Sequence, residues 1–387
     1  MMSTEEQLTK TLTDPRFERG MTLLKEKRLE EAVVAFADLL RTMCETEQLG
    51  DSLSVAPVYY QYGHALLSLA EATASLFGGA VGGDASAGGS EDAEQDAREA
   101  ADDLEAAWEM LELARVIYTR FPGDLAVEAQ LARVYTRLGD LGLESDQFEQ
   151  ARADFEKALM LRKKLLKASK ADDTTQLADL YCSLAIASIY RDSTAEGEKK
   201  QDQDEASAKR DEEGLTYYVL AGRVMAENIH RCASKCAKPL QEFVDKRIPK
   251  VSSDEDSEAP ASKGKGKRKA TGATDSSKSL LFTGAKPEAM KEEFTTCAKE
   301  EKNEEKLTKE EEQLLEYLEI YLELKEKVDG IKETAAGAVP DQSKTEESVT
   351  TIGFGQADAK TSAAPAVNVI PVVKKRKTET STSAESK

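Results

Sequence analysis

The stretch YTRLGDLGLESDQFEQARADFEKA, residues 135–158, decides the fold of this chain. Two bulky residues, Tyr135 and Leu138, precede the small Gly139. A second helical segment then carries apolar residues at helical spacing: Ala151, Phe155 and Ala158. Small residues let two paired helices approach closely, and large residues fill the space between them. The stretch therefore predicts a packed helical hairpin.

The spacing within and between these helices is that of a tetratricopeptide repeat, and weaker copies surround it. A first copy has Gly20, Ala32 and Phe36, although Arg16 and Arg19 stand where apolar residues are usual. A second copy is split, with Gly63 on one helix and Ala107, Leu111 and Ala114 on the other. A fourth copy begins at Tyr181, Leu184 and Ala185, and we expect its partner helix at Leu215–Ile229. We therefore predict an all-α solenoid of about four helical hairpins, because each hairpin buries its apolar face against the next.

The remaining segments set the predicted domain boundaries. We expect the solenoid at residues 13–250, with an acidic insertion at 78–103 and a charged insertion at 192–213. Residues 286–334 are expected to hold a C-terminal capping helix, because apolar residues recur there at i, i+3 and i+4 spacing: Leu314, Tyr317, Leu318, Tyr321 and Val328. A coiled-coil dimer seam is the alternative for that helix. Residues 251–285 and 335–387 are poor in large apolar residues and are predicted to be a disordered linker and tail.

Composition restricts the class of partner. The chain has 387 residues and a net charge of −20, from 73 acidic and 53 basic residues. Such a charge disfavours direct contact with nucleic acid or an anionic membrane, and it favours cationic partners or solubility alone. We find no membrane-length apolar run and no signal peptide, so we expect an intracellular protein whose five cysteines are reduced.

Two groups of acidic residues are candidates for binding a basic partner. The insertion carries a dense acidic run: Glu91, Asp92, Glu94, Asp96, Glu99, Asp102 and Asp103. It is either an attractor of Lys/Arg-rich tails or a solvated loop without a partner. The first helices of the later repeats add Asp140, Glu144, Asp146 and Asp179, which we expect on the concave face. Repeats that clamp a C-terminal carboxylate need Lys and Asn there, so this face should instead prefer a basic or mixed peptide.

No residue pattern predicts catalysis, a metal or a cofactor. The set His230, Cys232 and Cys236 lacks the fourth ligand of a structural zinc site, so we interpret the thiols as packing residues. The glycines of residues 78–83 are followed by no Lys-Ser/Thr pair and fit a linker better than a phosphate loop. The sole tryptophan, Trp108, is expected to pack in the core or between repeats.

Two basic runs indicate nuclear import, with a cytoplasmic pool allowed. The first run lies near the C-terminus, at Lys374, Lys375, Arg376 and Lys377, and the second covers Lys263–Lys269. Separately, the acidic residues around Ser252, Ser253 and Ser257 suit phosphorylation of these serines.

Several segments together resemble the nuclear autoantigenic sperm protein family of histone chaperones, which have interrupted tetratricopeptide repeats. The similar segments are residues 104–114 after the acidic interruption, residues 138–146, the helix at 311–332, and the import motif at 373–379. The resemblance implies binding of histone H3, alone or with H4, through Asp140, Glu144 and Asp146, and of linker histone H1 through the acidic interruption. Import receptors would be further partners, and the oligomeric state stays open. A scaffold or co-chaperone for non-histone peptides is the alternative.

Overall fold

Helices form every secondary-structure element in the part of the chain that the computed structural model describes, which is residues 3–76, 91–169, 174–191, 200–250, 286–299 and 307–335. The predicted all-α class is therefore confirmed. None of these helices is both long enough and apolar enough to span a membrane. The helices are α1 (Thr4–Leu12), α2 (Pro15–Lys25), α3 (Leu29–Arg41), α4 (Ala56–Leu76), α5 (Glu91–Tyr118), α6 (Leu125–Glu144), α7 (Phe148–Ser169), α8 (Thr175–Ile189), α9 (Lys200–Ala233), α10 (Lys238–Arg247), α12 (Pro287–Lys299) and α13 (Lys309–Ala335), and a π-helical turn at Thr42–Thr46 extends α3.

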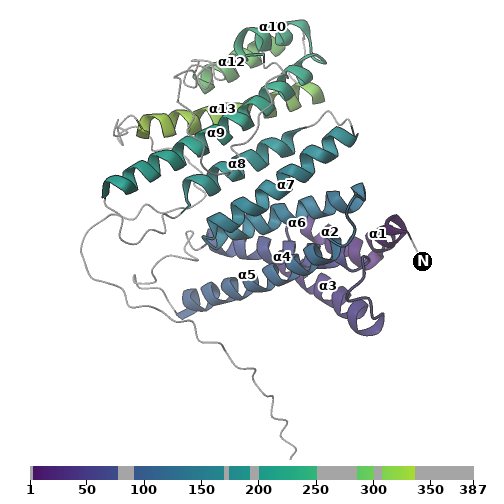
Figure 1. Ribbon diagram of the computed structural model, residues 1–387. Coiled ribbons are helices and arrows are strands. Elements are labelled where there is room, and N and C mark those ends of the chain that lie inside the picture. Colours follow the sequence, from purple (N-terminus) through teal and green to yellow (C-terminus); the bar gives the residue numbers. More distant parts are fainter. Residues whose placement is uncertain are drawn as a thin grey trace, which may run out of the picture.

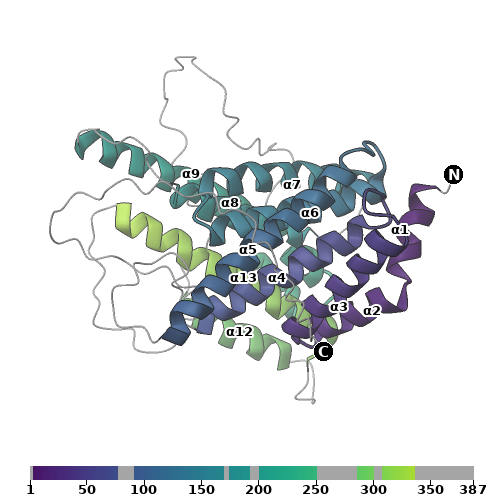
Figure 2. The same ribbon diagram turned by 90° about the horizontal axis from the view of Figure 1, so that it is seen from below.

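The helices pair in chain order and stack into a solenoid (Figure 1). The pairs α2–α3, α4–α5, α6–α7 and α8–α9 each form a hairpin, and the second helix of each hairpin packs against the first helix of the next. The view from below shows the same stacking (Figure 2). This is the four-hairpin arrangement that the repeats predict.

The small positions of the repeats make the same contact in three hairpins. A Cβ added to Gly139 would lie 2.5 Å from the ring of Phe155. The same construction on Gly20 meets the ring of Phe36 at 2.6 Å, and on Gly63 it meets the side chain of Leu111 at 2.9 Å. Distances this short leave no room for a methyl group. The absence of a side chain at these glycines is therefore what lets each pair of helices close.

Helices α5 and α9 begin inside the two ranges that the sequence predicts as insertions, residues 78–103 and 192–213. Helix α5 begins at Glu91, so residues 91–103 are its first turns, and residues 77–90 lie outside the described part. Ala100 and Leu104 bury their side chains there, which anchors this acidic end of the helix. Helix α9 begins at Lys200, so residues 200–213 are likewise helical. The density of charge hid this helical periodicity.

A buried charge network holds Glu213, on the charged part of α9, against α7. The Arg152 side chain on α7 is 10% exposed, and its Nη2 lies 2.6 Å from Glu213 Oε1 on α9. Arg152 Nε also bonds to Glu156 Oε1 at 3.1 Å, and Arg191 lies 3.7 Å from Glu213. Glu213, predicted to belong to a charged insertion, therefore joins the third hairpin to the fourth.

The C-terminal end of the solenoid is covered as the capping interpretation expects. Helix α13 packs along α9, and its apolar stripe is buried: Leu314, Tyr317, Leu318, Tyr321 and Val328. This burial within one chain favours a cap over a coiled-coil seam. Helices α10 and α12, which the sequence interpretation missed, extend this end through an edge-to-face contact of Phe243 with Phe294. Residues 251–285 and 336–387, the predicted linker and most of the predicted tail, lie outside the described part.

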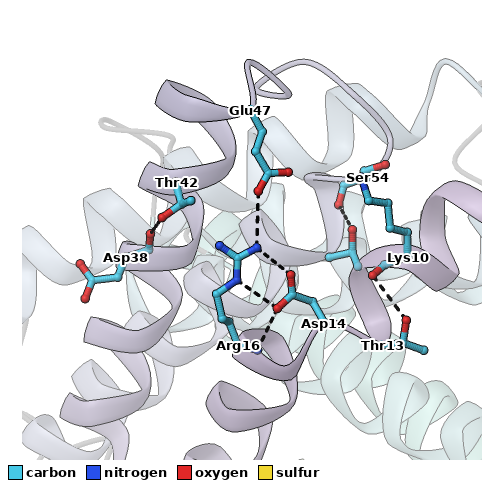
Figure 3. Close-up of polar contacts among 9 residues, drawn as sticks. Lys10, Thr13, Asp14, Arg16, Asp38, Thr42, Glu47 and Ser54 are labelled. Carbon is cyan, nitrogen blue, oxygen red and sulfur yellow. Dashed lines mark hydrogen bonds and ion pairs between the residues drawn. The ribbon is translucent and has the colours of Figure 1, made fainter.

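Polar contacts join α1, α2 and the turn after α3 near the N-terminal end of the solenoid (Figure 3). Arg16 holds Asp14, the N-cap of α2, at 2.7 Å and reaches Glu47 at 3.4 Å. The Thr11 hydroxyl of α1 donates to the Ser54 carbonyl oxygen. At this repeat position, where apolar residues are usual, Arg16 is therefore held by ion pairs with Asp14 and Glu47.

Candidate functional site

A pocket of about 660 Å³ opens between the second and third hairpins. We call it the Trp108 pocket, and it is lined by α5, the end of α6 and the start of α7: Ala101, Leu104, Glu105, Trp108, Glu112, Leu141, Glu144, Ser145, Asp146, Gln147 and Gln150. Leu104 and Leu141 are buried at its base, whereas the Trp108 side chain is 49% exposed. The pocket therefore combines an apolar surface with a rim on which every ionisable side chain is acidic.

The turn after α6 places Asp146 on this rim. Gln147 N–H donates to the Gly142 carbonyl at 2.7 Å, and Asp146 N–H donates to the Leu143 carbonyl at 3.2 Å. These two bonds form a Schellman motif, which needs a left-handed residue after the helix. Asp146 fills that position with a φ of 55°. Lys27 has the same conformation after α2, so the turn belongs to the repeat and the carboxylate is the special feature here.

The rim carries uncompensated negative charge. Partial burial raises the pKa of Glu144, and the neighbouring carboxylates Asp140 and Asp146 raise it further. Glu112 has a local partner, since it forms an ion pair of 2.6 Å with Arg115. Within the described residues we find no ion pair for Glu105, Glu144 or Asp146. A cation bound here would relieve the repulsion that these carboxylates share.

Trp108 was expected in the core or between repeats, and it lies between the second and third hairpins with about half of its surface exposed. Ala107, Leu111 and Ala114 are the α5 residues that face the paired helix, and all three are fully buried. Trp108 follows Ala107 and is rotated by about 100° from it around the helix, which turns the indole toward α6. This rotation could have predicted from the sequence that Trp108 does not face the paired helix. The prediction of a packed position instead followed the usual burial of tryptophan.

Asp140 belongs to a separate polar cluster between α4 and α6. Its carboxylate lies 2.9 Å from Arg137, which also approaches Glu71 at 3.5 Å. Arg137 Nε donates to His64 Nδ1 at 2.9 Å, and burial together with Arg137 and Arg133 lowers the pKa of His64 to about 3. Burial raises the pKa of Glu71 to about 6, against the opposing charge of Arg137 and with support from Asp140 and Glu144. Sequence analysis missed Glu71 because it lies near the end of an otherwise apolar helix.

The other predicted acidic residues are distributed unevenly. Asp179 is exposed on α8, which does not line the pocket. Glu99 and Asp102 are exposed on α5 just before the pocket wall, with Glu99 on the opposite side of the helix from Trp108. Burial raises the pKa of Tyr62, and the charge of Asp103 raises it further. The side chains of residues 91–97, the import motif and the three candidate phosphorylation serines lie outside the described part.

Two further hollows in the described residues differ in charge from the Trp108 pocket. One, of about 460 Å³ between α2 and α3, mixes Arg16 and Arg19 with acidic residues. The other, of about 520 Å³ near the end of α9, mixes His230 and Lys250 with acidic residues. Among the described residues no group of three His, Cys, Asp or Glu side chains converges as a metal site. His230 Nε2 instead faces the Ile248 carbonyl at 3.1 Å, and only the Trp108 pocket of these three is purely acidic.

The chain is similar to one protein family and to three known proteins. Residues 132–169, which include the end of α6 and all of α7, match the SHNi-TPR family. The chain is 36% identical over 84 residues to protein HGV2 of Halocynthia roretzi, 34% over 90 residues to the NASP-related protein sim3 of Schizosaccharomyces pombe, and 35% over 89 residues to the nuclear autoantigenic sperm protein of Homo sapiens. Each alignment covers 22% of this chain and 16%, 22% and 10% of the respective relatives. The matched stretch thus spans less than a quarter of each relative.

Proposed function

We propose, from the premise that this chain belongs to the nuclear autoantigenic sperm protein family, that it is a histone chaperone that binds H3, or H3–H4, at the Trp108 pocket. The single observation that carries the proposal is an exposed indole surrounded only by acidic charge, at Glu105, Glu112, Glu144 and Asp146. A histone segment that presents one apolar side chain between Lys or Arg residues would fit this surface.

The physical role of such a site is thermodynamic and needs no catalytic step. A bound histone segment would have its positive charge neutralised by Glu105, Glu144 and Asp146, so its non-specific contact with DNA would be reduced. Salt should weaken the charge contacts, while the apolar contact with Trp108 should persist. We expect the same chemistry to discriminate against peptides that end in an unpaired carboxylate, which a co-chaperone groove would select.

An acidic run precedes the pocket along α5. Glu99 and Asp102 are exposed on the helix whose next turn lines the pocket. We propose that a basic tail leaving the pocket continues onto this acidic run, and that linker histone H1 uses the run as its contact. The basic run at Lys374–Lys377 would direct the chain to the nucleus through import receptors, with a cytoplasmic pool before import.

A charge-reversal experiment tests the proposal. We expect purified full-length protein to bind H3–H4 with a submicromolar Kd at physiological salt, and the Glu144→Lys/Asp146→Lys variant to lose at least tenfold in affinity while its circular dichroism is unchanged. The matched control is Glu109→Lys/Glu323→Lys, which makes the same charge change at two exposed positions outside the pocket. An equal loss of affinity for H3–H4 in both variants would show that only net charge matters. An unchanged affinity in the Glu144→Lys/Asp146→Lys variant would show that the pocket is not the binding site.

A further inference from the structure

The chain carries a segment of its own that complements the Trp108 pocket. Residues 369–377 read Val-Ile-Pro-Val-Val-Lys-Lys-Arg-Lys, an apolar run followed directly by four cations. We propose that this segment docks in the Trp108 pocket of the same chain, with the valines on the indole and the cations on the acidic rim. The docking stands apart from the histone proposal, and only its effect on histone binding rests on that proposal.

The pocket offers both halves of the required chemistry. Its apolar part consists of Leu104, Leu141 and the exposed half of Trp108. Its acidic rim provides Glu105, Glu144 and Asp146, for which the described residues supply no ion pair. An apolar anchor beside a cationic cluster matches this arrangement better than charge alone, because desolvation of the indole adds to charge attraction.

The second basic run of the chain lacks one of these halves. Lys263–Lys269 alternates lysine with glycine and carries no large apolar residue. It would meet the acidic rim but leave the indole in water. The two runs therefore form a natural pair of test and control, similar in charge and different in apolar content.

The geometry of the fold permits the contact. Helix α13 ends at Ala335, and residues 336–368 separate it from the segment. A chain of that length spans about 110 Å when extended, and about 30–35 Å as a random coil. Both views show the end of α13 and the start of α5 on the same side of the molecule (Figures 1 and 2). A tether of this length gives an effective concentration on the order of millimolar, so a weak contact would be well populated.

Docking would couple two events that the sequence alone leaves separate. While the segment occupies the pocket, Lys374–Lys377 are unavailable to an import receptor and the acidic rim is unavailable to a basic partner. A histone that takes the pocket would displace the segment and expose the import motif. Import would then favour the loaded protein, because the two ligands compete for one surface.

The sole tryptophan makes the contact measurable in the full-length protein without any partner. We would compare acrylamide quenching of Trp108 fluorescence in the wild type, in Lys374→Gln/Lys375→Gln/Arg376→Gln/Lys377→Gln, and in the control Lys263→Gln/Lys265→Gln/Lys267→Gln/Arg268→Gln. We expect the quenching constant to rise at least twofold in the first variant and to stay unchanged in the control. We also expect the first variant to bind H3–H4 severalfold more tightly.

Three results would overturn the docking. Equal quenching in the wild type and the first variant means that the segment does not cover Trp108. An equal rise in both variants reduces the effect to net charge. Protection of Trp108 that fades on dilution assigns the occupant to a second copy of the chain. Quenching is measured without histone, so the two proposals can fail separately. Binding of H3–H4 without protection of Trp108 would support the proposed function and refute the docking. Protection of Trp108 without binding of H3–H4 would support the docking and refute the proposed function.

Discussion

Replacement of Trp108 by alanine is the sharpest test of the apolar half of the pocket. The side chain is 49% exposed, so a ligand that covers it removes about 120 Å² of a total near 250 Å² from water. At about 25 cal/mol per Å² this burial is worth at most about 3 kcal/mol. The cost of ordering the interface lowers that figure, and we expect a loss of about 1.5–3 kcal/mol, or roughly ten- to hundredfold in Kd.

The assay is a titration of full-length protein with H3–H4 by calorimetry, at low and at high salt. The control is Leu113→Ala, because Leu113 lies on the same helix, is 42% exposed and does not line the pocket. Both substitutions remove a half-buried side chain, so both should lower thermal stability by a similar small amount. A Kd for Trp108→Ala within twofold of the wild type, or an equal loss in Leu113→Ala, would refute the role of the indole.

Three further predictions concern the scaffold. Gly139→Ala should destabilise the protein by about 1–3 kcal/mol, because its Cβ meets the Phe155 ring at 2.5 Å, whereas Gly330→Ala on α13 meets nothing within 4 Å and should stabilise it slightly; thermal melts would show both. Arg152→Ala should lower the free energy of unfolding by about 3 kcal/mol, because it leaves the carboxylate of Glu213 largely buried with only a distant partner, and urea denaturation measures this loss. The pKa of Glu71 is raised to about 6 from an ordinary 4.5, so the folded chain holds the Glu71 proton more tightly than the unfolded chain. The stability that protonated Glu71 contributes is therefore full below pH 4.5 and is lost as pH rises through 6. Glu71→Gln should flatten this part of the profile of unfolding free energy against pH by about 1 kcal/mol, a value reduced for partial exposure to solvent.

The fold could be predicted from the sequence to the extent that steric contacts define it. Gly139 and Phe155 lie at the spacing of the repeat, and the same contact recurs at Gly20 with Phe36. The start of α5 could not be predicted, because the acidic run beginning at Glu91 obscures the apolar positions that anchor the helix. Helices α1, α10 and α12 were missed for a similar reason, since each is short and its burial depends on contacts with other elements.

The candidate site was predicted only in part. Glu144 and Asp146 do lie together on the rim, whereas Asp140 is paired with Arg137 and Asp179 lies on another helix. Sequence spacing placed all four on one face, because it identifies the helix but not the partners that each side chain meets. Trp108 was expected in the core or between repeats from its residue type, and its rotation away from Ala107 is what leaves half of it exposed between two hairpins.

The most direct measurement is crosslinking of carboxylates to lysines in the complex of the full-length protein with H3–H4, followed by mass spectrometry. If the Trp108 pocket is the binding site, Glu105, Glu144 or Asp146 should give the dominant crosslinks to histone lysines. Dominant crosslinks that lie on α8, α9 or α13, with none at the three rim carboxylates, would contradict the account.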